Sequence, residues 1–102
     1  MKYKTTINTT YDEYNEYIEN KFKSIHSPWQ IVDKDETIHK DYRIRNYFIM
    51  NGFNRGYYVF NLCVLENVDN IEVVIYFVNA DLFDNKKLFN KMKTKFIDEY
   101  NK

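Results

Sequence analysis

Three runs of β-prone residues in the middle of the chain place the tightest limit on its fold. They cover residues 38–50, 57–65 and 71–78, and each is rich in apolar, β-branched and aromatic side chains. The turn-forming residues between them are Asn51, Gly52, Asn54 and Gly56 in the first gap, and Asn67, Asp69 and Asn70 in the second. Because short turns join antiparallel neighbours, the sequence predicts a three-stranded antiparallel meander.

Two amphipathic helices are predicted, one on each side of this meander. Thr10, followed three residues later by Glu13, forms a capping box that predicts a helix beginning at Tyr11 and ending near residue 25, before Pro28. The apolar stripe of this helix consists of Tyr11, Tyr14, Ile18, Phe22 and Ile25. A second stripe, made of Phe89, Met92, Phe96 and Tyr100, predicts a lysine-rich helix that closes the chain.

The remaining elements complete a single α+β domain over residues 1–102. Alternating residues predict a strand over 2–8, and a short apolar segment at 29–32 predicts another, with Asp33, Lys34, Asp35 and Glu36 as an acidic loop after it. The predicted order is β-α-(β)-β-β-β-α, an antiparallel sheet of three to five strands with both helices on one face. The strand residues predicted to face the helices are Ile44, Phe48, Tyr58, Phe60 and Leu62.

Charge and cysteine content narrow the classes of function. Fifteen basic and fifteen acidic residues give a formal net charge of zero, which argues against a protein that mainly grips phosphate backbones. Cys63 is the single cysteine, and no apolar run resembles a signal peptide or a membrane span. We therefore expect a cytoplasmic protein, in the host-cell cytoplasm if a phage encodes it, with no membrane partner.

No combination of residues in the sequence favours catalysis or a metal centre. His26, His39 and Cys63 lack the spacing of metal ligands, and Cys63 reads as a small buried hydrophobic residue. Paired carboxylates such as Glu16 and Glu19 fall on predicted solvent-exposed faces, where a solvated surface is favoured over acid–base catalysis. The prediction is a protein that is not an enzyme and has no cofactor.

A nucleic-acid-binding role is the alternative interpretation. The order of one helix, three strands and one helix resembles a double-stranded RNA-binding domain, and Lys86 and Lys87 stand near the start of the last helix, where that family places phosphate-contacting lysines. Asn90 occupies the position of the family's third lysine, and Lys91 follows it. The resemblance implies RNA binding through Lys86, Lys87 and Lys91.

Surface aromatic and arginine side chains favour a protein partner instead. The outer face of the predicted sheet, opposite the helices, would carry Arg43, Arg45, Tyr57 and Tyr76, residue types that are enriched in protein interfaces. A different protein and a second copy of this chain both remain open as occupants of that face. The leading hypothesis is a small protein-binding module that occupies a partner's surface, as inhibitors, immunity proteins and phage anti-defence proteins such as anti-CRISPRs do.

Overall fold

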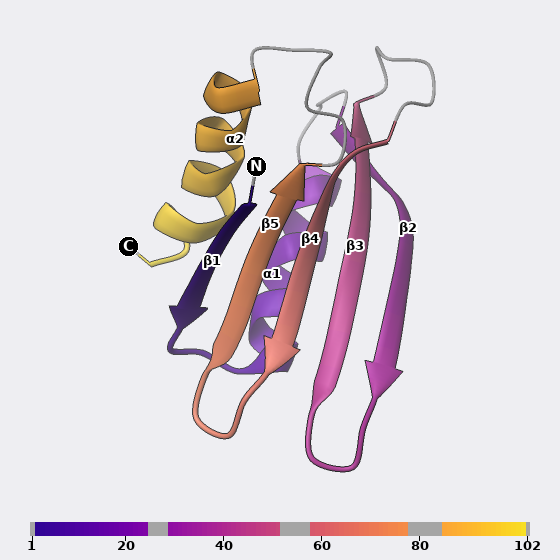
Figure 1. The fold of residues 1–102 in the computed structure, drawn as a ribbon, viewed down its shortest axis with the longest axis vertical. Coiled ribbons are helices and arrows are strands. Elements are labelled where there is room, and N and C mark those ends of the chain that lie inside the picture. The colour runs from indigo at the N-terminus through magenta and orange to yellow at the C-terminus, as the bar shows by residue number, and fades with distance from the viewer. Residues whose placement is uncertain (1, 25–28, 52–57, 78–84, 102) are drawn as a thin grey trace.

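The computed structural model describes residues 2–24, 29–51, 58–77 and 85–101, which form an antiparallel sheet and two helices (Figure 1). The α+β prediction is confirmed. In chain order, the elements are β1 (Lys2–Ile7), α1 (Tyr11–Ser24), β2 (Trp29–Ile38), β3 (Arg43–Asn51), β4 (Tyr58–Glu66), β5 (Ile71–Phe77), α2 (Asn85–Lys93) and a π-helical segment (Thr94–Asp98) that continues α2. Residues 52–57, which include the predicted contact residue Tyr57, lie outside the described ranges, as does His26.

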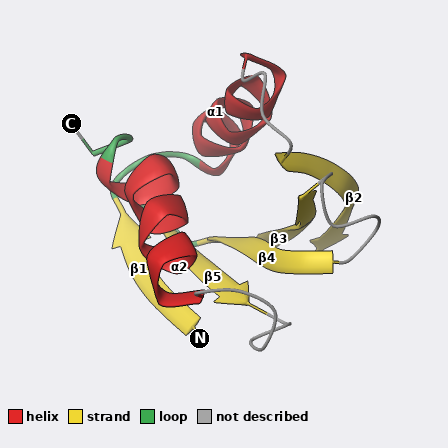
Figure 2. Ribbon diagram, turned by 90° about the horizontal axis from the view of Figure 1, so that it is seen from above, coloured by secondary structure: helices red, strands yellow, loops and turns green. Residues whose placement is uncertain are grey.

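The five strands are ordered β1-β5-β4-β3-β2, and every neighbouring pair is antiparallel. Strands β2 to β5 follow one another as a meander, and β1 adds to the far side of β5, with Ile7 opposite Ile71. This addition places β4 at the centre of the sheet and makes β1 and β2 its two edge strands. Seen along the strands in Figure 2, both helices lie over the same face of the sheet.

Helix α1 begins at Tyr11, as the capping box predicts. The Glu13 backbone N–H donates to Thr10 Oγ1 at 3.2 Å, which satisfies one of the amide donors left open at a helix start. The Glu13 carboxylate does not complete the box in the usual way, since its Oε2 instead accepts a hydrogen bond from Thr9 Oγ1 at 3.2 Å. The cap therefore extends one residue back into the β1–α1 connection.

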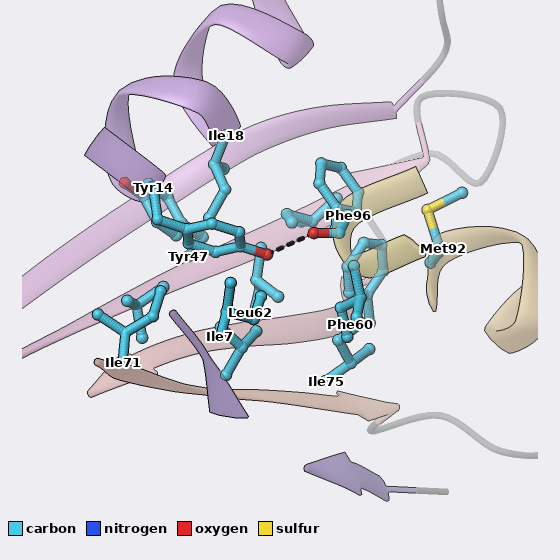
Figure 3. Close-up of a cluster of buried hydrophobic side chains, with 14 of the residues drawn as sticks. Ile7, Tyr14, Ile18, Tyr47, Phe60, Leu62, Ile71, Ile75, Met92 and Phe96 are labelled. Carbon is cyan, nitrogen blue, oxygen red and sulfur yellow. Dashed lines mark hydrogen bonds between the residues drawn. The ribbon is translucent and has the colours of Figure 1, made fainter. Parts of the chain in front are cut away.

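The hydrophobic core lies between the helices and the sheet (Figure 3). Its fully or almost fully buried members are Ile7 of β1, Tyr47 and Ile49 of β3, Phe60, Leu62 and Val64 of β4, Ile71, Val73 and Ile75 of β5, Tyr11, Tyr14 and Ile18 of α1, and Met92, Phe96 and Ile97 from α2 and the segment after it. Phe60 and Leu62 face the helices as predicted. Burial of an aliphatic side chain of this size stabilises the fold by about 1.5–3 kcal/mol.

The predicted facing of β3 is wrong. Tyr47 and Ile49 are fully buried beneath the helices, whereas Ile44 and Phe48 alternate with them and therefore lie on the opposite face. Residues 47–50 are apolar at every position, so their composition does not decide which face is inner. The prediction rested on Arg43 and Arg45 facing solvent, and the structure instead places both arginines on the helix-covered side, beside carboxylates of neighbouring elements.

The predicted acidic loop is also wrong, because Asp33, Lys34, Asp35 and Glu36 belong to β2. These residues pair with β3 from Asp33 opposite Phe48 to Glu36 opposite Arg45. The register shifts by one residue between Ile31 and Asp33, which is the mark of a β-bulge. Strand β3 supplies a backbone partner along the whole length of β2, and this pairing outweighs the low intrinsic β-propensity of the charged residues.

Candidate functional site

Arg43 lies in a partly exposed ion-pair cluster between β3, β4 and α1. Its Nε and Nη2 donate to the two carboxylate oxygens of Glu66 at 3.0 and 2.7 Å, a bidentate arrangement. Its Nη1 donates to Asp12 Oδ1 at 3.2 Å, and its guanidinium carbon lies 4.3 Å from the centre of the Tyr11 ring. The side chain is thus held by three neighbours on the helix-covered side of the sheet.

Arg45 forms the second half of this cluster. Its Nε and Nη2 donate to Glu36 Oε2 at 3.1 and 2.7 Å, and the same oxygen accepts a hydrogen bond from the Tyr11 hydroxyl at 2.6 Å. Its Nη1 lies 3.7 Å from Glu19 Oε2 on α1. The predicted position of Arg43 and Arg45 on the outer face of the sheet is therefore wrong, because both arginines join α1 to the end of the sheet.

The electrostatics of this cluster keep both carboxylates ionised. The hydrogen bond from Tyr11, with a smaller effect of Arg45, holds the pKa of Glu36 below its ordinary value. Hydrogen bonds from Arg43 lower the pKa of Glu66 in the same way. A lowered pKa makes a carboxylate a poorer base, so this arrangement suits structural cross-linking of elements and not proton transfer.

The other two residues of the predicted contact set do not join the arginines. Tyr76 lies on β5 with 46% of its surface exposed, on the face of the sheet opposite the helices. Tyr57 falls outside the described residues. Within the described chain, the predicted four-residue patch is split between two faces of the sheet.

The structure describes the side chains of some of the basic residues in the last helix. Lys91 is exposed on α2, and the ammonium of Lys93 lies 4.4 Å from the centre of the Tyr3 ring on β1. Lys86 and Lys87 fall in the first turn of α2, and their side chains lie outside the described part of the structure. The described residues thus place Lys91 on the exposed side of the helix.

The β2–β3 and β4–β5 turns lie at the same end of the sheet (Figure 1), and an apolar surface that sequence reasoning missed lies there. Ile38, Tyr42 and Val68 have 71%, 38% and 97% of their surfaces exposed there. A hollow of about 840 Å³ lies between the turns. Its lining is Asp41, Tyr42, Ile44, Leu65, Glu66, Asn67, Val68, Asp69 and Asn70. We call Ile38 together with these lining residues the hairpin-end surface.

The two turns that carry this surface are closed by backbone hydrogen bonds. The His39 N–H donates to the Tyr42 carbonyl at 2.8 Å, and the Asn67 N–H donates to the Asn70 carbonyl at 2.9 Å. The His39 ring stacks on the Tyr42 ring with centroids 4.4 Å apart. A sequence signal did exist, since Val68 stands alone between turn-forming residues where a polar side chain is usual.

Neither a metal centre nor a reactive thiol is evident in the described ranges. Among the described residues, no three His, Cys, Asp or Glu side chains gather closely enough to hold a metal ion. Cys63 is half-buried on β4, and burial raises the pKa of its thiol, which favours the less nucleophilic protonated form. No helix in the described part of the chain is long and apolar enough to cross a membrane.

Comparison with known proteins assigns no relative to this chain. No family model, curated protein or solved structure matches it. The functional argument therefore starts from the surfaces described above.

Proposed function

We propose that this protein is a small protein-binding module that acts by occupying a partner's surface, with the hairpin-end surface as its docking site. The observation that carries the proposal is the exposure of Tyr42 and Val68 in the lining of one hollow, with Ile38 exposed nearby at the end of β2. Apolar side chains gathered at a concave surface lose water when a partner covers them, and an aromatic ring at the centre is a common anchor of binding energy.

The charges around the hollow indicate the chemistry of the partner. Asp41 and Asp69 line its two sides, while Glu66 is paired with Arg43. An acidic rim around apolar walls complements a long basic side chain, whose aliphatic stem packs in the hollow while its charge meets the carboxylates. We therefore propose a partner protein that presents Lys or Arg beside apolar residues.

We propose the broader functional class by analogy with other small proteins that bind a partner. Small single-domain chains that work by covering a partner include inhibitors, immunity proteins and phage anti-defence proteins, and a docking surface of this kind suits such a role. With Cys63 as the single cysteine, we propose that this role is carried out in the cytoplasm.

Site-specific photo-crosslinking tests the docking site. A photoreactive phenylalanine analogue placed at position 68 is expected to capture a stoichiometric partner from nuclease-treated host lysate, and the same analogue at exposed Lys23 of α1 is the matched control. Val68→Asp with Tyr42→Ala should reduce retention of that partner at least about tenfold, since both remove apolar contact area. Equal capture at positions 68 and 23, or full retention by the double variant, would contradict the proposal.

Nucleic-acid binding through α2 is the second candidate, for which the exposed Lys91 is the supporting observation. It predicts that the protein retains double-stranded RNA, with affinity that falls steeply as salt rises. Lys86→Glu with Lys87→Glu would then abolish retention, while Lys2→Glu with Lys4→Glu would leave it nearly unchanged. That result would replace the protein-binding proposal with the RNA-binding one.

A further inference from the structure

The sheet has a second face, opposite the helices, on which the described residues place no other element (Figure 2). Because side chains alternate along each strand, the register fixes its members. They are Lys2, Lys4 and Thr6 of β1, Glu72, Val74 and Tyr76 of β5, Asn61, Cys63 and Leu65 of β4, Ile44, Asn46, Phe48 and Met50 of β3, and Gln30, Asp33, Asp35 and Thr37 of β2. We call this set the outer sheet face.

Charge is distributed unevenly across the outer sheet face. Its apolar residues lie on the three inner strands, β5, β4 and β3. Lys2 and Lys4 make the β1 edge basic, and the Lys4 side chain remains 59% exposed although its ammonium lies 3.2 Å from Glu72. Asp33 and Asp35 make the β2 edge acidic. The β1 flank of the outer sheet face is therefore complementary in charge to the β2 flank.

The edges themselves are poorly suited to pairing with another strand. Strand β1 carries lysines, and β2 carries four consecutive charged residues and a bulge, which are devices that oppose edge-to-edge extension of a sheet. The apolar area of the three inner strands points away from the sheet plane. A partner for this area must therefore stack on the face.

We propose that the outer sheet face binds a second copy of this chain, about a two-fold axis parallel to the strands. A two-fold axis that brings the same face of two sheets together lies in the plane between them. If it ran across the strands, β1 would meet β1 and β2 would meet β2, so like charges would oppose each other. An axis along the strands places β1 of one copy over β2 of the other, and both charged flanks are then paired.

The proposed two-fold axis fixes where Cys63 and the hairpin-end surface lie in the dimer. Since β4 is the central strand, the axis runs along it, and Cys63 of one copy faces Cys63 of the other. A rotation about the strand direction also leaves that direction unchanged. Both hairpin-end surfaces then lie at the same end of the dimer, where they could engage a repeated or dimeric partner with the gain in avidity that bivalence gives.

The size of the face sets the expected strength of the dimer. Five strands about 4.8 Å apart, each contributing about seven residues at about 3.3 Å per residue, give a face of roughly 550 Å². Stable interfaces commonly bury about 800 Å² per partner. We therefore expect a dissociation constant in the micromolar range.

Paired charge reversals test the arrangement by sedimentation equilibrium over a concentration series. Asp33→Lys with Asp35→Lys makes both flanks basic, and Lys2→Glu with Lys4→Glu makes both acidic. Each variant alone should raise the dimer dissociation constant at least about tenfold, and an equimolar mixture of the two should restore association as a heterodimer. The matched controls carry the same charge change on the helical side: Glu16→Lys with Asp98→Lys, and Lys23→Glu with Lys91→Glu.

Crosslinking supplies an independent measurement. A short bismaleimide should join two wild-type chains through Cys63, whereas Cys63→Ser with Lys23→Cys, which moves the thiol to α1, should give only collisional crosslinking.

A wild-type protein that stays monomeric up to its solubility limit would overturn the proposal. So would reversal variants that dimerise like their controls, or a mixture that does not associate. Ile44 and Leu65 belong to both the hairpin-end surface and the outer sheet face, whereas Val68 belongs to the hairpin-end surface alone. Val68→Asp should therefore leave the dimer intact, so failure of the hairpin-end surface as a docking site is measured separately.

Discussion

Tyr47 and Asn15 connect the middle of β3 to α1 by a buried hydrogen bond. The Tyr47 hydroxyl donates to Asn15 Oδ1 at 3.0 Å, and Asn15 Nδ2 donates to the Tyr11 carbonyl at 2.8 Å. Asn15 is a polar residue almost completely buried among the core residues, so both ends of its amide need partners. Such a bond fixes which residue of the helix lies over which residue of the sheet.

We predict that Tyr47→Phe lowers the free energy of unfolding by about 1–2 kcal/mol, because the ring stays packed while a buried amide oxygen loses its donor. In a double-mutant cycle with Asn15→Ala, the coupling between the two residues should be about 1 kcal/mol. Urea denaturation measures both quantities. Tyr42→Phe, an exposed tyrosine in the β2–β3 turn, is the control and should change stability by less than about 0.5 kcal/mol. Additive effects of Tyr47→Phe and Asn15→Ala would refute the coupling.

Among the elements, the π-helical segment after α2 owes its position to tyrosines of α1. Its widened backbone pattern brings the Glu99 N–H to the Thr94 carbonyl at 2.9 Å. The Tyr14 hydroxyl donates to the Phe96 carbonyl at 2.6 Å, shown dashed in Figure 3, and the Tyr17 hydroxyl donates to the Lys95 carbonyl at 2.9 Å. These two side-chain-to-backbone bonds join residues that are 82 and 78 positions apart in the sequence.

Removing these two hydroxyls should loosen the chain end without opening the sheet. Tyr14→Phe with Tyr17→Phe keeps both rings but leaves the two carbonyls without their tyrosine donors, so we predict faster amide hydrogen exchange over residues 96–101. Exchange in the central strand β4 should remain close to that of the wild type and provides the internal comparison. Equal acceleration in both regions would show that the tyrosines hold the whole domain and not this segment.

For the whole molecule, α1 is joined to the end of the sheet by charged groups as well as by apolar packing. Glu36 and Glu66 accept hydrogen bonds from Arg45 and Arg43, and Tyr11 lies between the two pairs. Both carboxyl groups have pKa values below the ordinary value of 4.5. Their contribution to stability is therefore fully present above about pH 4.5 and is lost as pH falls through the lowered values.

We predict that acid weakens the fold in this window and that Glu36→Gln with Glu66→Gln makes the loss shallower. The double variant should also be less stable than wild type at neutral pH, since Arg43, Arg45 and the Tyr11 hydroxyl all lose a carboxylate acceptor. Chemical denaturation at a series of pH values gives the profile, with Glu16→Gln, on the exposed side of α1, as control. A double variant whose stability falls as steeply as that of the wild type would assign the acid sensitivity to other groups.

Some of this architecture is determined by local pattern in the sequence. The stripe from Tyr11 to Phe22, the Thr10 cap and the β-prone runs predict the first helix and the central strands because helix and strand periods involve only neighbouring residues. The α+β class follows from those elements. The hydrogen-bonded register of β4 and β5 also places Phe60 and Leu62 on the inner face, where the alternation predicts them.

Tertiary structure decided what depends on residues far apart in the chain. Whether Arg43 faces water depends on Glu66 and Asp12, which only folding brings to it. Strand β2 continues through charged residues because β3 pairs with it there. The hairpin-end surface likewise exists only where two turns from different parts of the chain meet. Local periodicity contains none of this, because ion pairs, sheet register and surface hollows are properties of contacts between segments.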